Sequence, residues 1–225
     1  MKNEALKRIL SSVIIIPLAL FFIIKGSIFF IFFISVCFLI ASYEWYMMSK
    51  NKPYNILGHL FLLISFYSAF LWREYISLNA ESFLFIILIC VFTDIGGYTF
   101  GKIFKGPKLT KISPNKTYSG MIGGYLIAFI SVSAFIYSDF YFKSFGQLDI
   151  MLELYNIIFI FTVSTLCQLG DIIVSYFKRL SKIKDTGKLI PGHGGLLDRI
   201  DGMLFALPIT YLIYYHESGF WYWPY

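Results

Sequence analysis

Residues 168–201 read QLGDIIVSYFKRLSKIKDTGKLIPGHGGLLDRID. This stretch holds four of the thirteen acidic residues and six of the nineteen basic residues in a chain of 225 residues that is 58% hydrophobic. An ordinary charged loop between apolar segments is the simplest explanation for such a cluster. Its acids, bases and glycines, however, fall at spacings that suit a helix face and a phosphate-binding turn, so we interpret it as a site that carries chemistry.

The rest of the chain is typical of a polytopic membrane protein. Only 14% of the residues are charged and the mean hydropathy is +0.71, which is too apolar for a soluble domain of this size. A helix needs about 20 apolar residues to cross a bilayer, and a backbone in lipid must satisfy its own hydrogen bonds. We therefore predict an all-α fold with about seven transmembrane helices: 9–24, 27–48, 56–72, 82–100, 121–137, 154–174 and 203–220.

The positive charges predict the orientation of these helices. With a cytoplasmic N-terminus, sixteen Lys and Arg residues fall on the cytoplasmic side and three on the other. The net charge of +6 then reflects a face suited to anionic lipid and anionic solutes, not to nucleic acid. Neither linker nor repeat divides residues 1–225, so we expect a single domain. Cys37, Cys90 and Cys167 lie inside apolar runs and predict no disulfide framework.

A polar stripe follows the sixth predicted helix to its cytoplasmic end. Asp171, Ser175, Lys178 and Arg179 are spaced i, i+4, i+7 and i+8, which places them on one helix face. An ionisable residue at this depth is a functional candidate unless a partner neutralises it. The alternative is an ion pair along the helix, between Asp171 and Lys178, with no further role.

Three carboxylates gather near the same interface. Asp198 and Asp201 are three residues apart and so are neighbours on a helix, and Asp171 approaches from the preceding one. Oxygen ligands beside phosphate-binding cations indicate Mg²⁺ and a polyphosphate. Zinc is disfavoured because His193 is the only histidine nearby. The cations in this stretch are Lys178, Arg179, Lys182, Lys184, Lys188 and Arg199.

Glycines separate the two groups of acids. Gly192, Gly194 and Gly195 flank His193 and allow a backbone to approach a ligand closely and to aim N–H groups at phosphate oxygens. A glycine-rich turn alone is weak evidence, since many such turns bind nothing. Its position between carboxylates on a basic face strengthens the prediction of a phosphate loop.

A second cytoplasmic segment, residues 101–120, contains five lysines and no acid. Ser113, Lys116 and Thr117 offer hydroxyls and a cation for phosphate, although a turn with a positive anchor would explain them equally well. Asp94 precedes this segment and is expected to join the site. Two roles remain open for Glu44, in the second predicted helix: it joins the site, or it pairs with a lysine. The P-loop-like Gly96-x4-Gly101-Lys102 is rejected, because Ile103 stands where Ser or Thr would bind Mg²⁺.

Taken together, these motifs resemble the phosphatidate cytidylyltransferase (CDP-diacylglycerol synthase) family. The family's C-terminal signature is similar to two runs: Ser175-x2-Lys178-Arg179-x5-Asp185-x-Gly187 and Pro191-x-His193-Gly194-Gly195-x2-Asp198-Arg199-x-Asp201. The similarity extends to residues 168–171 and to the Ser113–Thr117 run. The chain departs from the family at 94–98, which reads DIGGY instead of an Asp-Thr-x-Ala-Tyr pattern, and at Ser119, where the family often has Glu.

This resemblance implies a reaction and a set of roles. CTP and phosphatidic acid would give CDP-diacylglycerol and pyrophosphate, with Mg²⁺ and room for a second cation, in a homodimer of the bacterial inner membrane. The acids matching Asp171 and Asp198 would hold metal. We predict catalytic roles for Asp171, Lys178, Arg179, Lys188, Asp198 and Asp201. Substrate-binding roles are predicted for Asp94, Ser113, Lys116, Thr117, Ser175, Asp185, His193, Gly194 and Gly195.

Two other functions compete with this hypothesis. A CTP-dependent lipid kinase, or a cytidylyltransferase for another lipid phosphate, would share the CTP-binding features and would differ in its products. A transporter would need polar residues through the middle of the bilayer. Here the polar residues crowd toward one interface, which disfavours transport.

Overall fold

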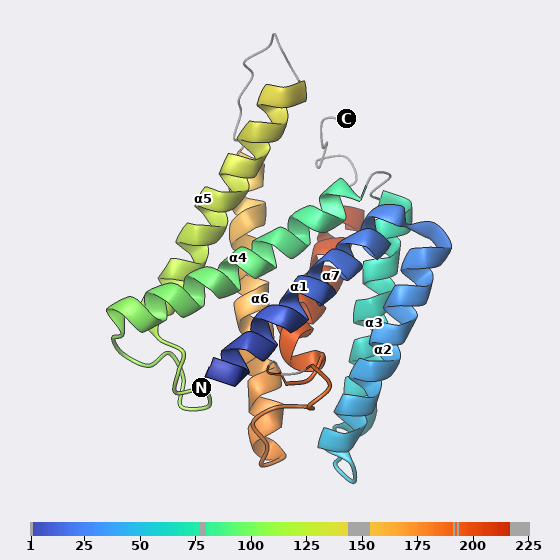
Figure 1. The fold of residues 1–225 in the computed structure, drawn as a ribbon, viewed down its shortest axis with the longest axis vertical. Coiled ribbons are helices and arrows are strands. Elements are labelled where there is room, and N and C mark those ends of the chain that lie inside the picture. The colour runs from blue at the N-terminus through green and yellow to red at the C-terminus, as the bar shows by residue number, and fades with distance from the viewer. Residues whose placement is uncertain (1, 77–79, 144–153, 191, 193, 217–225) are drawn as a thin grey trace.

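The computed structural model describes residues 2–76, 80–143, 154–190, 192 and 194–216, and over these residues it contains helices and no β-strand (Figure 1). The helices are α1 (Lys2–Lys25), α2 (Ser27–Ser49), α3 (Asn55–Leu71), α4 (Glu81–Phe104), α5 (Tyr118–Lys143), α6 (Leu154–Leu180) and α7 (Leu197–His216). A π-helical turn, η1 (Trp72–Ile76), extends α3. The prediction of an all-α fold is confirmed.

Four of the helical segments are long and apolar enough to cross a membrane: Ser27–Ser49, Asn55–Ile76, Glu81–Phe104 and Asn156–Leu180. Two shorter apolar segments, Leu10–Lys25 and Tyr118–Ala134, accompany them. Each of the seven predicted runs coincides with one helix, although α1 begins seven residues before the predicted start at 9 and α7 six residues before the predicted start at 203. Positions 217–220 of the last predicted run lie outside the described residues. The number of spans and the orientation of the N-terminus stay predictions.

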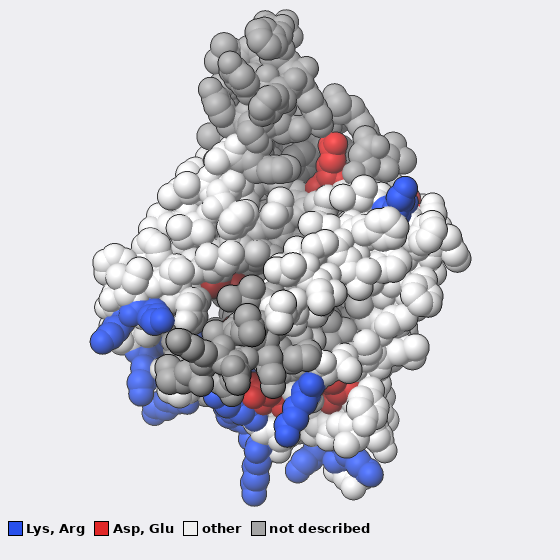
Figure 2. Space-filling model, in the orientation of Figure 1, with Lys and Arg blue, Asp and Glu red and all other residues white. Residues whose placement is uncertain are grey.

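The connections between helices divide between the two ends of the molecule. One end holds the start of α1, the α2–α3 turn, the α4–α5 loop and the α6–α7 loop, while η1 lies at the opposite end (Figure 1). We call the first of these the basic end, because most of the visible Lys and Arg side chains gather there in Figure 2. The prediction that the basic segments share one side therefore agrees with the arrangement of the helices.

Two apolar clusters fix the helices around the charged stretch. The larger cluster draws most of its residues from α4, α5, α6 and α7, with contributions from α1, α2, α3 and η1, and it includes fully buried side chains such as Ile89 and Ile160. The smaller joins α2, α3, α6 and α7 and contains Trp45, Leu62 and Leu197. Leu197 is the first residue of α7, so this cluster packs directly against the loop that carries most of the predicted site.

Helices α4 and α5 make the most extensive contact in the molecule, through glycines. A Cβ on Gly120 would lie 2.7 Å from the carbonyl oxygen of Gly97, and one on Gly96 would overlap the carbonyl oxygen of Gly123. The two backbones therefore touch, which leaves no space for side chains there. This contact sets the position of the α4–α5 loop, which supplies Lys116.

The glycine contact is tested by a matched pair of alanine variants. Gly96→Ala forces the α4 and α5 backbones apart, and we expect the midpoint of thermal unfolding in detergent to fall by roughly 3 to 8 °C. Gly97→Ala is the control, since its Cβ would have an ordinary contact at 3.7 Å. Equal unfolding temperatures for the two variants would contradict the packing described.

Candidate active site

The polar face of α6 binds a segment far away in the sequence. Lys116, from the α4–α5 loop, places its Nζ 2.5 Å from Oδ2 of Asp171. The hydroxyl of Ser175, one turn further along α6, donates to Oδ1 of Asp171 at 3.4 Å. The two basic-end segments predicted to build one site therefore meet at Asp171.

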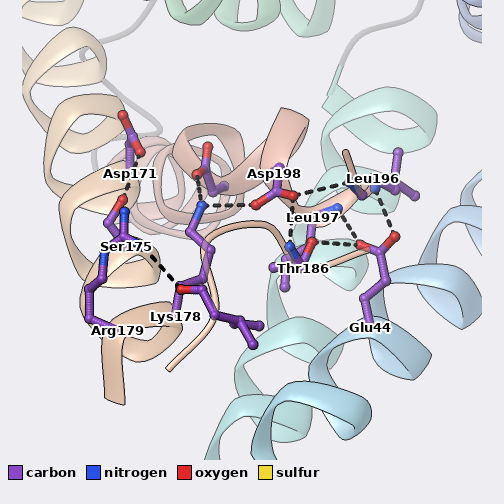
Figure 3. Close-up of polar contacts among 12 residues, drawn as sticks. Glu44, Asp171, Ser175, Lys178, Arg179, Thr186, Leu196, Leu197 and Asp198 are labelled. Carbon is purple, nitrogen blue, oxygen red and sulfur yellow. Dashed lines mark hydrogen bonds and ion pairs between the residues drawn. The ribbon is translucent and has the colours of Figure 1, made fainter. Parts of the chain in front are cut away.

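Lys178 joins α6 to α7. Its Nζ lies 2.9 Å from Oδ1 of Asp198 and 3.9 Å from Oδ2 of Asp201, and its side chain is only 10% exposed (Figure 3). The ion pairs of Asp171 and Lys178 thus connect different segments instead of running along α6. Lys178 pairs with the buried carboxylate of Asp198 and lies near that of Asp201, so it is a structural cation of the site as well as a candidate for binding phosphate.

Asp198 holds the α6–α7 loop through its second oxygen. Oδ2 accepts the N–H groups of Thr186 at 2.8 Å and Gly195 at 3.0 Å. Burial alone would raise the pKa of Asp198, but the hydrogen bond and charge of Lys178, with these two N–H groups, lower that pKa below its ordinary value. Asp198 is therefore charged in the folded protein, at the first turn of α7, where the helix dipole also favours an anion.

Two further carboxylates lie near Asp171, within range of its charge. They are Asp94, on α4, and Asp201, on α7. Asp201 precedes the predicted seventh span, and burial, reinforced by Asp171, raises the pKa of Asp201 well above its usual value. Asp94, which the sequence predicted to join the site, thus lies near Asp171 and Asp201.

The glycines of the α6–α7 loop make room for carboxylates. Gly192 and Gly194 have positive φ angles of 79° and 87°, and the N–H of Ile190 donates to the carbonyl of Gly194 at 2.9 Å. A Cβ on Gly194 would lie 2.9 Å from Oδ2 of Asp198. Glycine is therefore required here partly because the backbone lies in close contact with a buried acid. The prediction of a phosphate loop did not include this contact. His193 lies outside the described residues.

Among the remaining predicted residues, some make local hydrogen bonds and others are exposed. Thr117 accepts the N–H of Gly120 at 3.1 Å and so caps α5, and the backbone N–H of Ser113 donates to Thr110 Oγ1 at 3.1 Å. The guanidinium of Arg179 donates to the carbonyl of Ile183 at 3.1 Å. Asp185 and Lys188 are exposed, on the loop between the acid groups.

Glu44 is the residue that the sequence left unresolved. It lies on α2, 4% exposed, and its carboxylate receives hydrogen bonds from Thr186, Leu196 and Leu197 (Figure 3). These donors are neutral groups, so the pairing with a lysine considered from the sequence is not what the structure shows. In the sequence, the one sign of a role for Glu44 was its position as a single acid in a long apolar helix. That position did not reveal which groups the carboxylate binds.

A cavity of about 510 Å³ opens beside this contact, between α2 and the α6–α7 loop. Its α2 wall is largely apolar, and its loop wall includes the backbone that carries Lys188. The lining residues are Leu39, Ile40, Tyr43, Glu44, Met47, Thr186, Gly187, Lys188 and Leu189. The cavity therefore offers an apolar surface that leads toward a cation.

Comparison with known proteins identifies the family of this chain. The model of the cytidylyltransferase family matches residues 55–216, which include the α4–α5 loop, the α6–α7 loop and the three acids Asp171, Asp198 and Asp201. The chain belongs to the cytidylyltransferase family. Glu44 precedes the matched residues.

Bacterial relatives resemble the chain over most of its length. The phosphatidate cytidylyltransferase of Rickettsia felis is 33% identical over 219 residues, covering 94% of this chain and 93% of the relative. That of Staphylococcus saprophyticus is 36% identical over 186 residues, covering 80% of this chain and 67% of the relative. With the apolar helices, these bacterial relatives identify this family member as a membrane protein.

The charge pairing between α6 and α7 is tested by removing its cation. Lys178→Met leaves Asp198 and Asp201 buried without their shared partner, a change that costs about 3–5 kcal/mol in stability. We expect a large fall in the thermal unfolding midpoint in detergent. Lys184→Met, at an exposed position of the α6–α7 loop that follows, is the control and is expected to unfold like the wild type. A thermal unfolding midpoint of Lys178→Met equal to that of the wild type would contradict the pairing of Lys178 with the acids of α7.

Proposed function

We propose that this protein transfers CMP from CTP to phosphatidate, giving CDP-diacylglycerol and pyrophosphate. The observation that carries the proposal is the meeting of carboxylates and cations from α4, α6, α7 and two loops at the basic end of an apolar helical bundle. Phosphatidate keeps its acyl chains in the bilayer and its phosphate at the interface, while CTP arrives from water. The two substrates meet only at a site placed like this one.

The reaction suits the side chains of the site. A phosphate oxygen of phosphatidate attacks the α-phosphorus of CTP, and the bond from that phosphorus to the bridging oxygen breaks as pyrophosphate leaves. The attacking oxygen is already an anion, so no general base is needed. Catalysis then depends on overcoming repulsion between two polyanions, for which Lys188, Arg179 and Lys116 supply positive charge near the interface.

The donor set fits Mg²⁺. Among the described residues, no three His, Cys, Asp or Glu side chains form a ready-made metal cluster. Mg²⁺ in phosphoryl transfer is usually held by one or two carboxylates with substrate phosphates and water, and does not need such a cluster. We propose that Asp171 and Asp198 provide these carboxylates, with Asp201 as an orienting group. When bound, the ion would neutralise phosphate charge between the substrates.

The cavity between α2 and the α6–α7 loop supports a lipid substrate. Its apolar wall, formed by side chains such as Leu39 and Ile40, suits an acyl chain, and Lys188 suits the lipid phosphate. We therefore propose that phosphatidate enters from the side of this cavity. CTP enters from the side on which the acids of α6 and α7 lie. We also propose that the protein functions as a homodimer in the bacterial inner membrane, as the resemblance to the family implies.

The activity is tested with purified protein, CTP, Mg²⁺ and phosphatidate in detergent micelles. We expect release of pyrophosphate and formation of CDP-diacylglycerol. Asp171→Asn and Asp198→Asn are expected to lower the rate at least about 1000-fold, because each removes a carboxylate from the centre of the site.

The products also separate the competing functions. Release of CDP with a newly phosphorylated lipid would identify a CTP-dependent kinase. Turnover of a different lipid phosphate, with phosphatidate inert, would change the substrate. A folded wild-type protein that releases no pyrophosphate would contradict the proposed reaction, and full activity in either Asn variant would contradict the roles given to Asp171 and Asp198.

A further inference from the structure

Glu44 is buried in an apolar helix and satisfied by groups from one loop. Oε1 accepts the N–H of Leu196 at 2.9 Å, and Oε2 accepts the N–H of Leu197 at 2.8 Å and the hydroxyl of Thr186 at 3.1 Å. An unpaired carboxylate in this position would be strongly unfavourable. The three donors therefore bind the α6–α7 loop and the start of α7 firmly to α2.

The loop approaches Glu44 as closely as a backbone can. A Cβ on Gly187 would lie 2.7 Å from Oε1 of Glu44, and a Cβ on Gly195 would lie 2.6 Å from Oε2. Any side chain at either glycine would push the loop away from α2 or displace the carboxylate. Gly195, from the predicted glycine-rich turn, and Gly187, from the family signature, thus both lie directly against Glu44.

Thr186 links Glu44 to the acids of the active site. Its hydroxyl donates to Glu44, while its backbone N–H donates to Oδ2 of Asp198. Gly195 donates to the same oxygen of Asp198, one residue before the N–H of Leu196 that binds Glu44. The loop is therefore held at Thr186 and at its junction with α7 between two carboxylates, Asp198 on one side and Glu44 on the other (Figure 3).

This arrangement places residues that the reaction needs. Lys188 follows Thr186 by two residues, and Asp198 follows Leu197 directly. Moving the loop away from α2 would move the cation and reorient the first turn of α7. We propose that Glu44 is a positioning residue for nucleotide transfer, which holds the α6–α7 loop in the conformation that receives the CTP phosphates. This inference rests on the proposed function for its kinetic consequences, but not for its structural ones.

A graded series of variants tests the kinetic consequence. Thr186→Val removes one of the three hydrogen bonds, and Glu44→Gln keeps one acceptor oxygen but turns an amide group toward a donor. Glu44→Ala removes all three bonds. We expect kcat/KM for CTP to fall about fivefold, about tenfold and about 100-fold in that order. The KM for CTP should rise along the series, which a smaller folded fraction alone would not cause.

Limited proteolysis tests the structural consequence without the reaction. Trypsin sites at Lys182, Lys184 and Lys188 lie in the α6–α7 loop. Lys102 and Lys105, in the basic segment 101–120, serve as an internal reference. We expect Glu44→Ala to be cleaved at least about tenfold faster at the α6–α7 loop, with unchanged cleavage at the reference sites.

Glu74 provides a matched control for both measurements. It also accepts a backbone N–H, that of Ser27 at 2.9 Å, but at the opposite end of the molecule. Glu74→Gln should keep the wild-type KM for CTP and the wild-type cleavage pattern. Wild-type kinetics and wild-type cleavage in Glu44→Ala would overturn the inference. An inactive wild type would contradict the proposed reaction instead, and faster loop cleavage in Glu44→Ala would still support the positioning role.

Discussion

The site depends on one constraint: backbone N–H groups of a loop that enters a helix at the edge of an apolar bundle need acceptors. A helix leaves its first N–H groups without internal partners, and buried N–H groups are rarely left unsatisfied. Two carboxylates meet this need, Glu44 from α2 and Asp198 from α7. They convert a glycine-containing loop into a fixed part of the structure, and Lys188 takes its position from that loop.

Charge balance extends this arrangement to the other helices. Lys178 pairs with Asp198 and lies near Asp201, and Lys116 reaches Asp171 from a loop that the α4–α5 glycine contact holds in place. These ion pairs join α6 to α7 and to the α4–α5 loop, so charge as well as apolar packing holds the segments of the site together.

Sequence reasoning predicted what local patterns determine. Apolar runs located every helix, and the signature located Asp171, Lys178 and Asp198 together at one end. The partners of these residues were not predictable, because an ion pair between α6 and α7 leaves no periodic trace in either helix. Glu44 illustrates the same limit. It lies 142 residues from Thr186, and the closeness of Gly187 and Gly195 to its carboxylate emerges only when the chain is folded.

Hydrogen exchange of the wild-type protein tests the central claim most directly. The amides of Thr186, Gly195, Leu196 and Leu197 belong to a loop and a helix start, where exchange is usually fast, but here they donate to buried carboxylates. The account predicts that all four exchange at least about 100-fold more slowly than the exposed amides of the same loop. Exchange of these amides at the exposed rate would contradict it.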